Sequence, residues 1–133
     1  LLIAGTANLA NLLDLRPGRA AKVTAVGLLA VALTTRVGAV PLAWCAGVAA
    51  GVLPIDLRER AMLGDAGANA VGAALGVGLV VAAVPAARIA ALVVVTVLTL
   101  ASERVSFSRV IDSTPPLRWL DQLGRVDDSS VRA

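Results

Sequence analysis

One segment organises the rest of the chain: Met62-Leu63-Gly64-Asp65-Ala66-Gly67-Ala68-Asn69-Ala70-Val71-Gly72. It places the Asp65 carboxylate between two glycines, where the charged run Asp56-Leu57-Arg58-Glu59-Arg60 meets residues 66–87, which contain no ionisable residue. A carboxylate at the mouth of a membrane helix is costly unless it holds a cation or a proton. The N-terminus of the helix behind it favours an anion such as a phosphate. The segment therefore predicts a metal–phosphate site at a membrane surface.

The composition is that of a membrane protein. The 133 residues are 58% hydrophobic with a mean hydropathy of +0.85. Charged residues make up 16%, whereas soluble domains typically carry about 25%. The pI near 10.4 invites a nucleic-acid interpretation, but the basic residues follow the membrane pattern described below, so we expect no nucleic-acid partner.

The sequence lacks histidine, a second cysteine and a basic region at its start, and each absence excludes one kind of site or segment. The sequence contains no histidine, which excludes a histidine base or a histidine metal ligand within this chain. The single cysteine, Cys45, excludes an internal disulfide and is expected to be a small packing residue. The chain begins Leu1-Leu2-Ile3 without a basic region, which is unlike a signal peptide. It reads as if it started inside a helix, and we expect it to be a piece of a longer protein.

Apolar segments separated by charged loops predict the topology. A partial leading helix over 1–13 is followed by apolar segments at 23–35, 37–55, 66–87 and 89–102. If each segment crosses once, ten of the twelve basic residues and all nine acidic ones share one side. Basic residues accumulate in cytoplasmic loops, so the pattern predicts an all-α, polytopic membrane helix bundle with about four transmembrane helices plus the leading helix. The protein is expected in the plasma membrane, with the Asp65 side cytoplasmic.

Two units follow from this topology. Residues 1–112 are expected to form the membrane helix bundle. Residues 113–133 are expected to form a cytoplasmic tail, which contains the break Pro115-Pro116. The tail contains a short amphipathic stretch, 117–123, which is expected to lie on the membrane surface. Within the bundle, the glycine pairs Gly47/Gly51 and Gly72/Gly76 are expected to let helices approach closely.

A second polar group lies upstream of Asp65. Asn8, Asn11 and Asp14 are spaced i, i+3, i+6, so a helix places them on roughly one side near its cytoplasmic end. They fit interhelical hydrogen bonding and capping, or a substrate- or metal-facing cluster opposite Asp65. Asp14 and Asp65 lie on the same side in the predicted topology. Two carboxylates there could hold Mg²⁺, which prefers oxygen ligands and bridges to substrate phosphates.

Together these residues resemble a known family. Asn8-x-x-Asn11-x-x-Asp14, two apolar segments, Leu53-Pro54 and 62–68 are similar in order and spacing to the motifs of the polyprenyl-phosphate N-acetylhexosamine-1-phosphate transferases. That family includes the phospho-N-acetylmuramoyl-pentapeptide transferase of peptidoglycan synthesis. Its members carry Asn-x-x-Asn-x-x-Asp-Gly-x-Asp-Gly and Met-Gly-Asp-x-Gly-Ser. The resemblance covers about residues 1–110, the C-terminal half of such an enzyme.

The resemblance implies an activity, a cofactor and site residues. It implies transfer of a sugar-1-phosphate from a UDP-sugar to a polyprenyl phosphate, with release of UMP, in cell-envelope precursor synthesis. Asp65 and Asp14 would be catalytic, with Asp65 associated with Mg²⁺. The substrate-binding residues, on the nucleotide-sugar side, would be Asn8, Asn11, Gly64 and Gly67. The implied partners are the lipid phosphate, the UDP-sugar, the membrane and, as an open alternative, a second copy in a homodimer.

The chain also departs from the family pattern, which keeps a second hypothesis open. Pro17 stands where the family has its second aspartate, Ala68 stands where it has a serine, and the expected histidine-rich loop near 109–118 has no histidine. The alternative is therefore a catalytically degenerate relative that acts as a membrane scaffold or binds the lipid carrier. An unrelated membrane transporter fragment is the third hypothesis. Arg58 and Arg60 fit phosphate neutralisation or membrane orientation.

Overall fold

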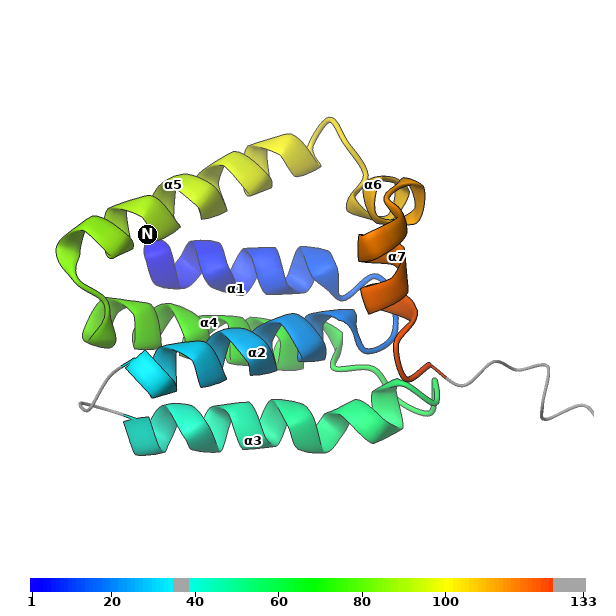
Figure 1. Cartoon of the computed structure of the whole chain (residues 1–133), viewed down its shortest axis with the longest axis horizontal. Helices are drawn as coiled ribbons and strands as arrows, with labels where there is room; N and C mark the ends of the chain where they lie inside the picture. Colours follow the sequence, from blue (N-terminus) through cyan, green and yellow to red (C-terminus); the bar gives the residue numbers. More distant parts are fainter. Residues whose placement is uncertain (35–38, 126–133) are drawn as a thin grey trace, which may run out of the picture.

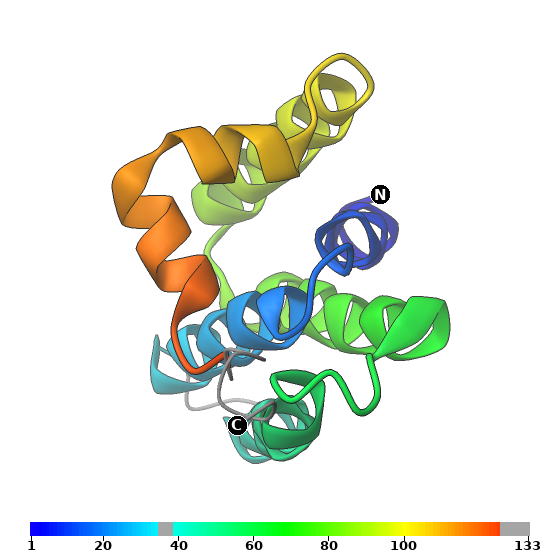
Figure 2. The same ribbon diagram turned by 90° about the vertical axis from the view of Figure 1, so that its right-hand side faces the viewer.

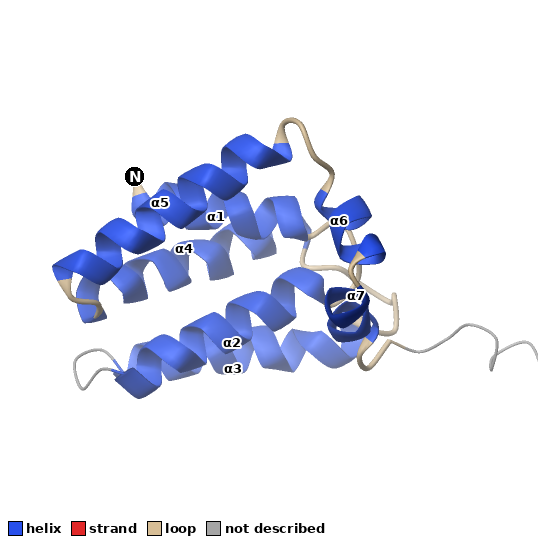
Figure 3. Cartoon of the chain, turned by 45° about the horizontal axis from the view of Figure 1, so that its top comes forward, coloured by secondary structure: helices blue, strands red, loops and turns tan. Residues whose placement is uncertain are grey.

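The computed structural model describes residues 1–34 and 39–125, which form helices and no strands (Figure 3). The all-α prediction is confirmed. The helices are α1 (Leu2–Leu13), α2 (Arg19–Thr34), α3 (Ala39–Asp56), α4 (Gly64–Ala82), α5 (Pro85–Ser102), α6 (Phe107–Ser113) and α7 (Pro115–Gln122). The expected segments 23–35 and 37–55 and the expected tail 113–133 each extend into residues outside the described ranges.

The long helices α1 to α5 lie side by side, and successive helices run in opposite directions (Figure 1). The shorter helices α6 and α7 lie across one end of this bundle, as the end-on view also shows (Figure 2). The loops that follow α1, α3 and α5 all lie at that end (Figure 1). We call it the loop end, and every charged candidate residue discussed below belongs to it.

Two prolines set helix boundaries. Val84 is extended and Pro85 opens α5, a position at which the fixed φ and missing N–H of proline are tolerated. Within the apolar segment 66–87, α4 ends at Ala82 and Pro85 begins the next helix. Thr114 is likewise extended and Pro115 opens α7, so the break expected at this point is present. Helix α6, just before it, had not been predicted.

Two helices are long and apolar enough to cross a membrane. They are α4, with a mean hydropathy of 1.5, and α5, with 1.9. The apolar helix α1 (Leu2–Leu13) is shorter than a span requires. Length and composition within the described residues therefore support two membrane-spanning helices, and they do not show the expected bundle of about four.

Helices α1 and α4 approach closely because α4 presents glycines to α1. A Cβ added at Gly72 would lie 2.6 Å from the Ala10 Cβ atom and 2.6 Å from the Thr6 carbonyl oxygen. One added at Gly76 would lie 2.6 Å from the Ile3 Cα atom. The expected role of Gly72/Gly76 in packing is thus confirmed. At Gly47/Gly51, by contrast, an added Cβ would meet no described atom within 4 Å.

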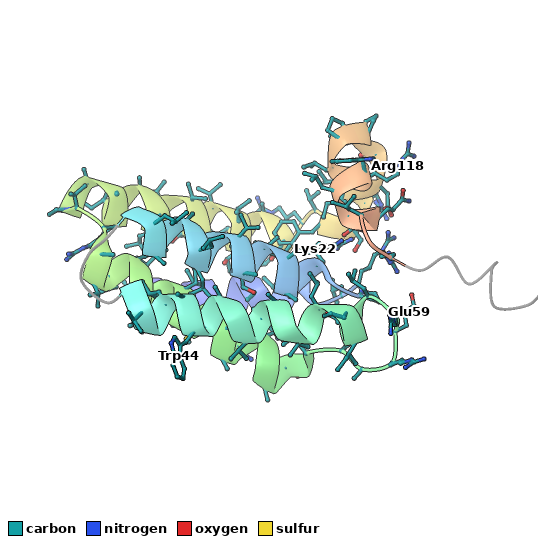
Figure 4. The ribbon with its side chains drawn as sticks, turned by 60° about the horizontal axis from the view of Figure 1, so that its bottom comes forward. Lys22, Trp44, Glu59 and Arg118 are labelled. Carbon is teal, nitrogen blue, oxygen red and sulfur yellow. The ribbon has the colours of Figure 1, made fainter. Side chains whose placement is uncertain are left out.

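The buried apolar core is small. Leu28 of α2 packs against Leu42 and Ala46 of α3, with Leu75 of α4 beside them. Large apolar side chains also point outward, among them Trp44, which is 74% exposed and points away from the bundle in Figure 4. On α5 the helix surface is almost entirely exposed, and Val95 is its buried residue. Apolar surface on this scale needs lipid or a protein partner to cover it.

Candidate functional site

The α1–α4 contact brings Asp14 to the start of α4. The face of α1 that meets the α4 glycines carries Ile3, Thr6 and Ala10, and a helix continues that stripe to position 14. Asp14 caps the end of α1, and its backbone N–H donates to the carbonyl oxygens of Ala10 and Asn11, each at 3.1 Å. Its carboxylate is therefore carried towards the residues that open α4.

The Asp14 side chain lies in an environment that disfavours a negative charge. Its Oδ1 atom is buried and has no hydrogen-bond partner in the described part of the chain. Burial raises the pKa of Asp14, and the negative charges of Asp56 and Asp65 raise it further, while the backbone N–H of Gly64 opposes the shift. A positive species beside Asp14 would relieve this cost.

Asp65 and its neighbouring glycines lie on the more exposed side of the same candidate site, at the start of α4. Gly64 opens α4 with φ +63°, a conformation in which a residue with a Cβ would be strained. Asp65 follows in the first helical turn and is exposed. Gly67 faces the side chain of Leu63, whose Cδ2 atom would lie 3.0 Å from an added Cβ. The Asn69 amide donates to the Asp65 carbonyl oxygen at 2.8 Å, which supports this first turn.

Asp56, the last residue of α3, is the functional candidate that sequence reasoning missed. Its side chain has 0% exposure, and neither carboxylate oxygen has a hydrogen-bond partner among the described residues. Burial raises the pKa of Asp56. The backbone N–H of Gly18 and the charge of the Lys22 ammonium oppose the shift. In the sequence Asp56 looks like one more charge of a solvated loop, and no local pattern marks it as buried.

A second set of charges fastens α6 and α7 to the start of α2. Arg19 donates to both carboxylate oxygens of Asp121, at 2.7 and 3.1 Å, and both side chains are 4% exposed. Arg16 makes a matching pair with Asp112, at 2.7 and 2.6 Å. The Lys22 ammonium donates to the carbonyl oxygens of Leu120 and Asp121 at the end of α7, at 3.2 and 2.8 Å. Figure 4 shows Lys22 at this junction.

The surroundings of this junction lower the pKa of Asp121 and also the pKa of Lys22, for different reasons. Burial alone would raise the pKa of Asp121, but the hydrogen bonds and charge of Arg19, helped by Arg125 and Arg16, outweigh burial and lower it. Burial also lowers the pKa of Lys22, and the charge of Asp121 partly offsets this. The last helix of the expected tail is thus docked on the bundle through side chains that lie 102 residues apart.

The surroundings of Asn8 and Asn11 differ from those of Asp14. Asn8 is exposed and lines a cavity of about 500 Å³ between α1 and α5, together with Gly5 and Thr99. Asn11 is half-buried in the last turn of α1. Asn8 therefore faces α5, whereas Asp14 faces the start of α4.

The side chains available as metal ligands limit the kind of metal site that this region can form. In the described ranges, no group of three carboxylate, cysteine or histidine side chains is arranged to hold a metal ion on its own. Asp14 nevertheless offers an unpartnered buried oxygen beside the charge of Asp65. Mg²⁺ is commonly held by one or two carboxylates completed by substrate phosphates and water, so these residues fit a magnesium ion that arrives with a phosphate. Arg58 and Arg60 are exposed in the adjacent loop, and their role stays a prediction.

No family model, no curated protein and no solved structure matches this chain.

Proposed function

We propose that this chain is part of a membrane transferase that moves a sugar-1-phosphate from a UDP-sugar to a polyprenyl phosphate, as the resemblance of its motifs implies. The observation that supports the proposal most is the approach of Asp14 to Gly64 and Asp65. These residues belong to two motifs separated by 50 positions, and the charge and N–H groups of the second act on the carboxylate of the first. A functional pairing explains that approach, since the two carboxylates repel each other.

A membrane setting is supported by α4 and α5, each long and apolar enough to span a bilayer. The finer topology remains part of the proposal: about four crossings, with the loop end cytoplasmic, as the charge distribution predicts. Helices too short to span alone, such as α1 and α2, would complete the bundle by packing against α4. A lipid phosphate would then meet Asp65 at the depth of the headgroups.

The chain's own groups suit phosphoryl transfer, in which positioning and electrostatics supply most of the catalysis. The backbone N–H groups that follow Gly64 in the first turn of α4 lack partners within the helix and can orient phosphate oxygens. Asp14 and Asp65 would hold Mg²⁺, which supplies charge neutralisation on the phosphates when bound.

The test is UMP release by the full-length protein that contains this chain, purified in detergent with Mg²⁺, undecaprenyl phosphate and a panel of UDP-sugars. Wild type is expected to release UMP, and Asp65→Asn is expected to lose release. Glu103→Gln is a control of equal charge change, because Glu103 is exposed at the same end of the bundle. Absence of release from every UDP-sugar would contradict the transferase.

The scaffold hypothesis is the second candidate, and one observation favours it. Ala68, which stands where the family has a serine, is fully buried with 0% exposure, so this position serves packing and offers nothing to a substrate. A scaffold would bind undecaprenyl phosphate without releasing UMP. Lipid-phosphate binding by both wild type and Asp65→Asn, with no UMP from either, would support the scaffold over the enzyme.

A further inference from the structure

A cavity of about 600 Å³ lies between α2 and the α6–α7 pair at the loop end. Its walls are almost entirely apolar. Helix α2, the helices α6 and α7, and the residue after α7 supply Val23, Val26, Ile111, Leu117, Leu120 and Leu123. Apolar surfaces held apart around empty space lose the contacts that would stabilise them. Several of these side chains are also exposed, so the cavity opens to the surroundings of the bundle and can be filled from there.

Basic residues line one end of this cavity. The lining residues of α2 include Arg19, Lys22, Val23 and Val26, whose spacing of i, i+3, i+4 and i+7 puts them on one face of the helix. At 1.5 Å per residue, this face runs for roughly 10 Å from Arg19 at the loop end to Val26 in the middle of α2. An elongated amphiphile, with a charged head and an apolar tail, matches this order.

Lys22 is the group that favours an anionic head. Arg19 is already bound to Asp121 through two hydrogen bonds. The Lys22 ammonium has three N–H donors, and two of them go to the carbonyl oxygens of Leu120 and Asp121. Asp121 and the buried Asp56 act on Lys22 electrostatically, but within the described ranges no carboxylate forms an ion pair with it. Its charge and its third donor therefore suit a phosphate oxygen.

The cavity is separate from the site around Asp65. The described residues that line it belong to α2, α6 and α7 or directly follow α7, and none belongs to α1 or to the start of α4. In the end-on view, α7 lies on one side of α2 and α4 begins on the other (Figure 2). On its open side the cavity continues into the exposed apolar surface of α2, where Val26 is 68% and Leu29 is 50% exposed. In a membrane, lipid covers such a surface.

We propose that this cavity binds an anionic phospholipid of the bilayer, with an acyl chain between α2 and α7 and the headgroup phosphate on the Lys22 ammonium. Basic pockets between membrane helices on the cytoplasmic side bind lipids of this class. The proposal rests on the membrane setting of the proposed function, but it does not depend on the transferase reaction. Polyprenyl phosphate, by contrast, is proposed to meet Asp65 at the start of α4.

The test is native mass spectrometry of the full-length protein that contains this chain, in detergent with equal amounts of phosphatidylglycerol and phosphatidylcholine. Wild type is expected to retain one phosphatidylglycerol in preference to phosphatidylcholine. Lys22→Gln should weaken phosphatidylglycerol binding by about tenfold or more, as loss of one charge-assisted hydrogen bond implies. Lys22→Arg keeps the charge and should keep the preference. Arg118→Gln removes an exposed basic residue of α7 and should bind like wild type.

A second pair of variants tests the cavity itself. Val23→Trp places an indole in the cavity and should exclude a lipid with either headgroup. Val93→Trp is the matched control, because Val93 lies on α5 and is 56% exposed, against 48% for Val23. Both positions are exposed, so both variants should fold, and thermal unfolding verifies this.

Unchanged phosphatidylglycerol binding in Lys22→Gln or in Val23→Trp would overturn the proposal. Equal losses in Val23→Trp and Val93→Trp would also overturn it, because they would indicate lipid that merely surrounds the bundle. Displacement of phosphatidylglycerol by undecaprenyl phosphate, one molecule for one, would assign the cavity to the polyprenyl lipid instead. Absence of UMP release with intact phosphatidylglycerol binding would contradict the transferase and leave the phospholipid site standing.

Discussion

Two buried carboxylates at the loop end have opposite environments. Asp121 is 7% exposed and receives two hydrogen bonds from Arg19, whereas Asp56 is 0% exposed and receives none from the described residues. The pKa is lowered for Asp121 and raised for Asp56. The two carboxylates differ in their ion pairs. Asp121 fastens α7 to α2 through Arg19, while Asp56 is buried without an ion pair in the described part of the chain.

The largest expected effect comes from removing Arg19, the partner of the buried Asp121 carboxylate. Arg19→Met leaves Asp121 buried without its partner, which typically costs about 3–5 kcal/mol. The free energy of unfolding, measured by denaturant titration in detergent, should fall by that order. Arg118→Met, on the exposed side of α7, is the matched control and should change it little.

The double variant Arg19→Met/Asp121→Leu sharpens the same point. Replacing both partners by apolar residues removes the orphaned charge, so most of the lost stability should return. If the single variant Arg19→Met is as stable as wild type, the pair does not fasten α7 to α2, and the contrast with Asp56 disappears.

A smaller effect should appear as opposite responses to acid, measured with a chelator present. The raised pKa of Asp56 makes wild type less stable than Asp56→Asn at neutral pH, and this gap should close as pH falls towards 3.8, the ordinary Asp value. The lowered pKa of Asp121 makes wild type more stable than Asp121→Asn, and this gap should persist at 3.8 and close only below it. Gaps that close together would show that the two carboxylates do not differ.

The smallest expected effect is at the half-exposed pair of Arg16 with Asp112, whose side chains are 35% and 42% exposed. Arg16→Gln should lower the free energy of unfolding by about 0.2–1 kcal/mol, and less at high salt. The same denaturant titration at low and high ionic strength measures this. A loss as large as that of Arg19→Met would mean that burial does not distinguish the two pairs.

Local pattern predicted helix formation well and helix pairing only in part. The apolar segments became helices, and Pro85 and Pro115 set boundaries because proline constrains the chain locally. The pairs Gly72/Gly76 and Gly47/Gly51 have the same spacing, yet only the first packs against another described helix. A glycine pair permits another helix to approach closely, but it does not specify which helix does so. The sequence alone therefore could not distinguish the two pairs. The expected count of about four spans stays a prediction, because two of the described helices, α4 and α5, meet the length and hydropathy of a span.

The candidate site was predictable where it depends on topology. Asp14 and Asp65 were placed on one side by counting segments, and the charge of Asp65 does act on the Asp14 carboxyl group. The burial of Asp56 and the Arg19–Asp121 pair were not predictable, because each depends on contacts between distant segments. The spacing of Asn8 and Asp14 did not specify which helix each would meet, and Asn8 faces α5.

The central claim is a metal–phosphate site at the start of α4, and pulsed electron paramagnetic resonance of bound Mn²⁺ tests it most directly. With UDP-sugar added to the full-length protein, we expect phosphorus hyperfine coupling to Mn²⁺ that is lost in Asp65→Asn and retained in Glu103→Gln. Mn²⁺ that binds without any phosphorus coupling, or coupling unchanged by Asp65→Asn, would contradict the claim.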